Sequence, residues 1–157
     1  MLSVKDSVDG NSSTSAPTLD LHEIQATVLR PRPAPYFGTH VLLRVDDAQA
    51  GRKFLRRLTP HIASAANWWN AANTWLDVGI SYAGLEALGV PQDSLQSFPE
   101  AFRVGMAARA GQLGDDGVND PKNWDPAYAM GQLHIGVSAF TDSEEKRRRA
   151  LAIAREQ

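Results

Sequence analysis

The side chains best suited to bind a metal ion are the four histidines, because the 157-residue chain contains no cysteine. They are His22, His40, His61 and His134. None has a second histidine or a carboxylate at the spacing that lets one helix bind a metal, and the sequence lacks His-Glu-x-x-His. His40 and His134 fall in segments that resemble neighbouring strands. A zinc pair there and two ordinary half-buried histidines are both open, and we favour the second.

Carboxylates gather in residues 115–126, which read Asp-Asp-Gly-Val-Asn-Asp-Pro-Lys-Asn-Trp-Asp-Pro. Calcium binding is one interpretation. The spacing does not fit an EF-hand loop, which also ends in a bidentate Glu that this segment lacks. Asx turns, in which Asp or Asn side chains accept nearby backbone N–H groups, explain the same residues and are favoured.

Four basic side chains lie on one predicted helix: Arg52, Lys53, Arg56 and Arg57. A phosphate-binding patch is one interpretation, and the solvent-facing side of an amphipathic helix is the other. We favour the second because such a helix needs a polar face. The sequence has no Gly-x-Ser-x-Gly nucleophile elbow and no phosphate-binding glycine loop. The residues alone therefore define no catalytic site.

Composition indicates an ordinary globular protein, with 43% hydrophobic and 22% charged residues. A net charge of −2 favours neither nucleic acid nor an anionic membrane as partner. No apolar run approaches the roughly 20 residues of a membrane helix, and no export signal or twin-Arg pair is present, so a cytoplasmic location is expected. Residues 1–18 are polar and predict a disordered tail, whereas 19–157 predict one domain.

Alternating apolar and polar residues predict three strands. They span residues 40–45, 74–80 and 132–140. The first runs from His40 to Val45, with Val41, Leu43 and Val45 on one face.

Helix signals fall between and after these strands. Asp47 is placed to cap a helix ending near residue 58, and Ser81 to cap another that Gly89 ends in a left-handed conformation. Ser97 and Glu100 resemble a capping box for a helix reaching about residue 110. A last helix follows residue 142.

The predicted order is strand, helix, strand, two helices, strand, helix. This is an α+β arrangement, and it matches a ferredoxin-like split βαβ unit with an antiparallel sheet and a helical insertion after the second strand. Such a unit has one further strand, which pairs with the first, and we find none up to residue 157. We therefore expect the strand from His40 to Val45 to form an exposed edge.

Apolar residues recur at roughly helical spacing in the insertion, at Phe98, Phe102, Met106 and Leu113, with Gly105 on the same side. A small residue there would let a backbone or a flat ligand come close. A cofactor pocket is one interpretation and a stripe packed into the core is the other, which we favour.

Several segments, taken in order, resemble the dye-decolourising (DyP-type) haem peroxidases. The first is Glu23-Ile24-Gln25-Ala26-Thr27-Val28-Leu29, similar to the family's Asp-Ile-Gln-Gly-Asn-Ile-Leu. The others are Ser81-Tyr82-Ala83-Gly84-Leu85, Phe98-Pro99-Glu100, Leu113-Gly114-Asp115 and Asn123-Trp124-Asp125-Pro126. The resemblance covers about residues 21–140, and Ala26 departs from it because the family usually has Gly there.

The resemblance implies two ferredoxin-like halves and a haem b peroxidase that uses hydrogen peroxide to oxidise dyes and phenolic substrates. The family's Gly-x-x-Asp-Gly motif, distal Arg and proximal His all follow the matched region. The chain's Asp-Gly pairs, at residues 9–10 and 116–117, have Asp6 and Leu113 where the motif requires glycine. We therefore assign no catalytic, haem-binding or metal-binding residue, and expect that this chain alone does not bind the haem.

Two hypotheses follow. In the first, the chain is an N-terminal fragment or subunit of a DyP-type peroxidase, catalytically incomplete alone, and its partner is the missing C-terminal peroxidase segment. In the second, it is a non-catalytic α+β binding module that associates with itself through the exposed first strand. A peroxidase complete within this chain is the least favoured interpretation.

Overall fold

The computed structural model describes residues 18–30, 36–68 and 74–155. The predicted disordered tail, residues 1–18, lies outside these ranges apart from Thr18. The predicted domain over 19–157 stays a prediction. Within the described ranges, no helix is long and apolar enough to cross a membrane.

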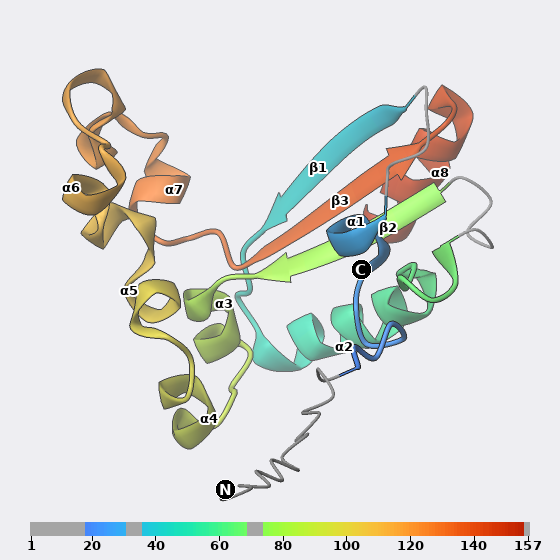
Figure 1. Ribbon diagram of the computed structural model, residues 1–157, viewed down its shortest axis with the longest axis horizontal. Helices are drawn as coiled ribbons and strands as arrows, with labels where there is room; N and C mark the ends of the chain where they lie inside the picture. Colours follow the sequence, from blue (N-terminus) through green and yellow to red (C-terminus); the bar gives the residue numbers. More distant parts are fainter. Residues whose placement is uncertain (1–17, 31–35, 69–73, 156–157) are drawn as a thin grey trace, which may run out of the picture.

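The described residues form one antiparallel sheet of three strands. They are β1 (Phe37–Leu43), β2 (Thr74–Ile80) and β3 (Ile135–Thr141), in the order β1-β3-β2 (Figure 1). Both outer strands pair with β3, and Val137 of β3 lies opposite Val41 on one side and Val78 on the other. The α+β class and the antiparallel ferredoxin-like arrangement are therefore confirmed.

Eight α-helices surround the sheet in the described ranges. They are α1 (Ala26–Leu29), α2 (Ala48–Leu58), α3 (Tyr82–Ala87), α4 (Gln92–Gln96), α5 (Glu100–Ala108), α6 (Ala110–Leu113), α7 (Pro126–Ala129) and α8 (Glu144–Arg155). Three short 3-10 helices span Thr59–His61, Gly117–Asn119 and Pro121–Asn123. The insertion from α3 to α7 extends past one end of the sheet (Figure 1).

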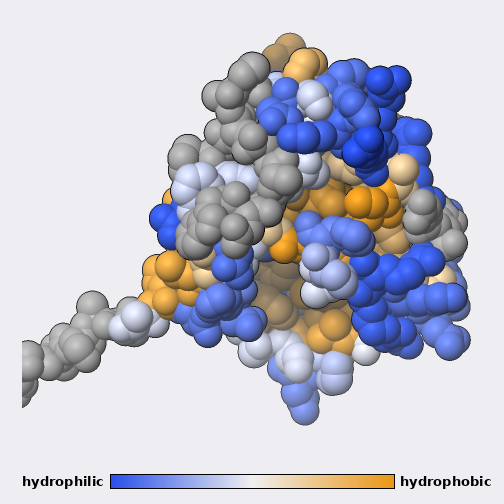
Figure 2. Space-filling model, turned by 90° about the vertical axis from the view of Figure 1, so that its right-hand side faces the viewer, coloured by the Kyte–Doolittle hydropathy of each residue, from blue (hydrophilic) through white to orange (hydrophobic). Residues whose placement is uncertain are grey.

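One face of the sheet packs against α2 and α8. Leu76, Ile135 and Val137 form its buried centre, joined by Leu58 of α2 and by small α8 residues such as Ala154. Alanines on α8 let that helix lie close to the strands, because they add little side-chain bulk. The molecule also shows apolar surface bordered by polar side chains when seen from the right-hand side of Figure 1 (Figure 2).

The opposite face is covered at one end by α1. Ala26, Ala63, Trp75 and Phe140 form a second buried cluster there. Trp68 packs edge-on against Trp75, with ring centroids 5.8 Å apart. The two faces of β2 are therefore both partly buried, Leu76 on one side and Trp75 on the other.

The predicted first strand was right in type and face but wrong in position. It was expected from His40 to Val45, whereas β1 begins at Phe37 because Phe37 pairs with Thr141 at the far end of β3. It ends at Leu43 because the N–H of Val45 donates to the ring of His134 at 3.0 Å.

The helical insertion departs most from the predictions. Ser97 does not cap α5; its hydroxyl donates to the carbonyl of Ser94 at 2.7 Å and belongs to the end of α4, which the sequence analysis missed. Gly105, at φ 74°, interrupts α5. The expected core stripe is instead exposed: 37% for Phe98 and for Phe102, and 62% for Met106.

The predicted helix ends near the sheet are confirmed. Asp47 accepts the N–H of Ala50, Ser81 accepts the N–H of Gly84, and Gly89 has a positive φ of 77°. Gly84 also meets the start of β3, where a Cβ would lie only 2.2 Å from the backbone oxygen of His134. This contact explains why glycine occupies that position.

Gly84→Ala should lower the free energy of unfolding by about 1–3 kcal/mol, because the added methyl must push α3 away from β3. Urea denaturation followed by circular dichroism measures the change. Gly111→Ala is the matched control, since a Cβ at this helical glycine meets nothing within 4 Å. Equal stability of the two variants would contradict the close approach at Gly84.

Candidate functional site

The outer edge of β2 is closed by a side chain. The Gln25 amide lies against Val78, where its Nε2 donates to the backbone oxygen at 2.8 Å and its Oε1 accepts the backbone N–H at 2.7 Å. Ile62 makes a parallel β-bridge to Leu76, two residues earlier on the strand. An amide side chain thus satisfies the same backbone groups that a further strand would satisfy.

Burial of Ala26, the first residue of α1, positions Gln25. Ala26 is 0% exposed, and its N–H donates to the oxygen of Ala63 at 2.8 Å. The Thr27 hydroxyl donates to Asp77 at 2.7 Å on the same strand that Gln25 clamps. The methyl of Ala26 is accommodated in the second cluster, so the departure from the family's glycine leaves this anchor intact.

The opposite edge of the sheet is open. In the described part of the chain, β1 pairs with β3 on one side and with no strand on the other. Its Phe37 and Leu42 side chains are 42% and 47% exposed. We call the outer edge of β1, with the exposed Phe37, His40 and Leu42 side chains, the β1 surface. It is the candidate functional site, because an unpaired strand edge can accept a further strand.

The histidines do not converge. The Nδ1 of His40 lies 2.8 Å from the hydroxyl of Ser138, whereas the Nδ1 of His134 accepts the N–H of Val45. His40 is paired with Ser138, and His134 lies beyond the last pair, Leu43 with Ile135. The zinc-pair interpretation is therefore wrong. The described residues contain no cluster of three or more metal-binding side chains.

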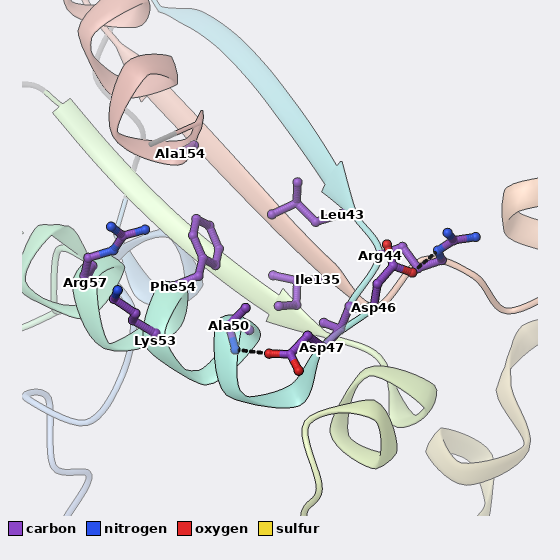
Figure 3. Close-up of a pocket in the computed structure, with 12 residues that line it drawn as sticks. Leu43, Arg44, Asp46, Asp47, Ala50, Lys53, Phe54, Arg57, Ile135 and Ala154 are labelled. Carbon is purple, nitrogen blue, oxygen red and sulfur yellow. Dashed lines mark hydrogen bonds and ion pairs between the residues drawn. The ribbon is translucent and has the colours of Figure 1, made fainter. Parts of the chain in front are cut away.

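A pocket of about 380 Å³ lies between α2, the end of β1 and α8 (Figure 3). Its apolar lining includes Leu43, Phe54 and Ala154. The charged groups at one end are already paired, since Asp47 caps α2 and Asp46 forms an ion pair with Arg44 at 2.7 Å.

A haem does not fit this pocket chemically. Its lining contains no histidine, cysteine, methionine or tyrosine, so none of these residues can ligate a haem iron there. His22, His40 and His61 are exposed on the surface, and the ring of His134 is bonded to the backbone. The lining of this pocket therefore offers a haem iron no axial ligand.

The basic residues of α2 do not form a phosphate site. Arg52 donates to the backbone oxygen of Leu88 and so ties α2 to the end of α3. Lys53 and Arg57 line the pocket, while Arg56 is exposed. The arrangement agrees with a solvent-facing helix side.

The carboxylates of residues 115–126 form Asx turns. Asp120 accepts the N–H of Lys122, and Asp125 accepts the N–H of Ala127, each at 3.0 Å. Hydrogen bonds from the backbone and the side chain of Lys122 lower the pKa of Asp120 below its usual value. This confirms the Asx-turn interpretation at these two positions.

No role for Gln25 was predicted from the sequence, although the residue lies in the first of the family-like segments. The available signal was an amide side chain between the apolar residues Ile24 and Ala26. Without the fold, nothing indicated which strand that amide would reach.

The geometry is that of an α+β unit in which Gln25 and Ile62 cover the edge of β2, and β1 pairs with no further strand among the described residues. A sequence profile described as the DyP dimeric alpha+beta barrel domain matches residues 23–153. The chain therefore belongs to the DyP-type peroxidase family, in which it corresponds to the N-terminal domain. A search of curated proteins gave no significant match.

Solved structures agree with this assignment. The chain is 30% identical to an ancestral D-type dye decolorizing peroxidase, with a TM-score of 0.70 over 86% of this chain and 31% of that one. A decolorizing peroxidase from Auricularia auricula-judae shares the fold at 20% identity, with a TM-score of 0.71 over 85% of this chain and 29% of that one. The chain thus spans about a third of the length of these two peroxidases, 31% and 29%.

If two copies of this chain associate through the β1 surface, Leu42→Lys should raise their dissociation constant at least about tenfold. The reason is that burying an unpaired ammonium costs more than about 1.4 kcal/mol. Sedimentation velocity over a concentration series measures this. Leu42 is 47% exposed, so the fold should survive. Val118→Lys, at a residue 87% exposed on the insertion, is the control. The same effect from both variants would exclude β1 as the contact.

Proposed function

We propose that this chain is the N-terminal unit of a DyP-type haem peroxidase, an enzyme that uses hydrogen peroxide to oxidise dyes and phenolic compounds. In this proposal the chain is catalytically incomplete alone. The observation that carries it is the family match over residues 23–153, and the separate structural alignment covers 31% of the ancestral peroxidase.

The role proposed for this chain is to form part of the peroxidase structure and to bind its second unit. Its β1 surface accepts a strand from the second unit, which would complete the ferredoxin-like sheet. The haem b and its ligands belong to that second unit, so no catalytic step is assigned to residues of this chain.

The exposed apolar side chains of the insertion support a second contact with the same unit. Phe98 and Phe102 have ring centroids 5.1 Å apart, and Tyr82 meets Phe102 edge-on at 6.2 Å. Met106, also in α5, is 62% exposed. Exposed apolar groups gathered in one place often mark an interaction surface.

A non-catalytic, self-associating α+β module is the alternative function. It is favoured by the open β1 edge and by the word dimeric in the family description. Two copies could pair their β1 strands about a two-fold axis and form one continuous sheet without any haem.

Co-expression of this chain with the haem-bearing part of a DyP-type peroxidase tests the proposal. We expect a stable complex with a sharp, saturable Soret band and peroxide-dependent dye oxidation. This chain alone should give a broad, unsaturated band on haemin titration. A sharp band from the chain alone, abolished by one His→Ala substitution, would show that it binds haem itself. Failure of the two polypeptides to associate would instead favour the self-associating module.

A further inference from the structure

The pocket between α2, the end of β1 and α8 is lined mainly by apolar side chains that belong to the main core (Figure 3). Ile135 and Ala154 line it and are only 2% and 4% exposed, and the half-buried Leu43 and Phe54 line it as well. Its volume of about 380 Å³ falls within the range of about 300 to 1,000 Å³ that is usual for small-molecule pockets. The pocket can therefore bury the hydrocarbon part of a small ligand.

The charged groups of the lining differ between the two ends of the pocket. At the start of α2, Asp47 accepts the N–H of Ala50 at 2.6 Å, and Asp46 forms an ion pair with Arg44 at 2.7 Å. Lys53 and Arg57 lie further along α2, at a spacing that places them on the same side of the helix (Figure 3). Among the described residues, no carboxylate forms an ion pair with the ammonium of Lys53. The charge that the pocket offers to a ligand is therefore positive.

The two helices that flank the pocket are basic as a whole. Of the chain's 16 basic and 18 acidic residues, α2 and α8 together carry nine basic and two acidic ones. Both of these acidic residues are already paired within α8, Glu144 with Arg147 and Glu145 with Arg149. This helical layer therefore attracts anions, although the whole chain has a net charge of −2.

We propose that this pocket binds a small amphipathic carboxylate with an unbranched alkyl chain. The alkyl chain lies among Leu43, Phe54 and Ile135, and the carboxylate lies at the ammonium of Lys53. An alkyl chain is assigned because it can bend to follow an irregular lining in which Phe54 is the one aromatic side chain. An inorganic anion such as phosphate would leave this apolar lining unfilled. The site uses neither the β1 surface nor the insertion, so it does not rest on the proposed function.

A titration with three ligands that share one alkyl chain tests the assignment. Octanoate, octan-1-ol and octylammonium differ in charge, and amide chemical shifts in the ¹⁵N-labelled chain measure where and how tightly each binds. We expect saturable shifts at Leu43, Gly51 and Phe54 and none at Gly111 of the insertion. Octanoate should bind about two- to fivefold more tightly than octan-1-ol, as expected for one exposed ion pair, and octylammonium most weakly. Absence of saturable shifts around the pocket, or equal binding of octylammonium and octanoate, overturns the proposal.

Lys53→Met locates the carboxylate, because it keeps an apolar side chain of similar length and removes the charge. The dissociation constant of octanoate should rise about two- to fivefold, and that of octan-1-ol should stay unchanged. Arg56→Met is the matched control, since Arg56 is an exposed cation on the same helix that does not line the pocket. Equal effects of the two variants would reveal general attraction to a basic helix and overturn the assigned position.

Ala50→Leu fills the pocket from α2. Ala50 is exposed, and its backbone N–H still bonds to Asp47, so the helix cap is kept. This variant should weaken octanoate and octan-1-ol alike by at least about tenfold, because the added side chain occupies the space of the alkyl chain. Circular dichroism checks the fold, and unchanged octanoate binding by the folded variant contradicts the proposed position. If the variant does not fold, the comparison of Lys53→Met with Arg56→Met decides.

Discussion

Backbone hydrogen bonding at the edges of a small sheet is the constraint on which this structure depends. A three-stranded sheet has two edges, and each presents N–H and C=O groups that need partners. The chain satisfies one edge internally with the amide of Gln25 and the backbone of Ile62. Among the described residues the other edge, β1, pairs with no further strand, and its Leu42 side chain is 47% exposed.

Small residues make this arrangement possible. Gly84 allows α3 to begin against the backbone of His134, and Ser81 fixes the same turn by accepting the N–H of Gly84. Ala26 allows α1 to pack beside Trp75, which places Gln25 at Val78. Residues of the family motifs therefore explain how closely these elements approach one another. The similarity of these motifs to the family therefore reflects how the helices and strands pack. It supports membership of the family, but it does not identify a reactive group.

Much of the sheet could be predicted from the sequence because its signals are local. The alternation of apolar and polar residues predicted the faces of β1 and the span of β2. The helix caps at Asp47 and Ser81 could be predicted because they involve only neighbouring backbone groups. The ends of the first strand were wrong because they depend on its register with β3, which lies far along the chain. The prediction for the insertion failed for another reason. The spacing of its apolar residues suggested a buried helix face, but Gly105 interrupts the helix, and the insertion extends past the end of the sheet. The Gln25 clamp was unpredictable because it joins segments 53 residues apart.

The exposed insertion distinguishes between the two functional hypotheses. A symmetric dimer through β1 would use the same edge twice and needs no contact from α4 or α5. Phe98 and Phe102 would then stay 37% exposed, and Met106 62%, which is a continuing cost for a group of apolar side chains. A second unit of a larger enzyme could cover the insertion as well as β1, because a heterologous partner is not restricted to one self-complementary patch. The incomplete burial of the insertion therefore weighs toward a unit of a larger peroxidase.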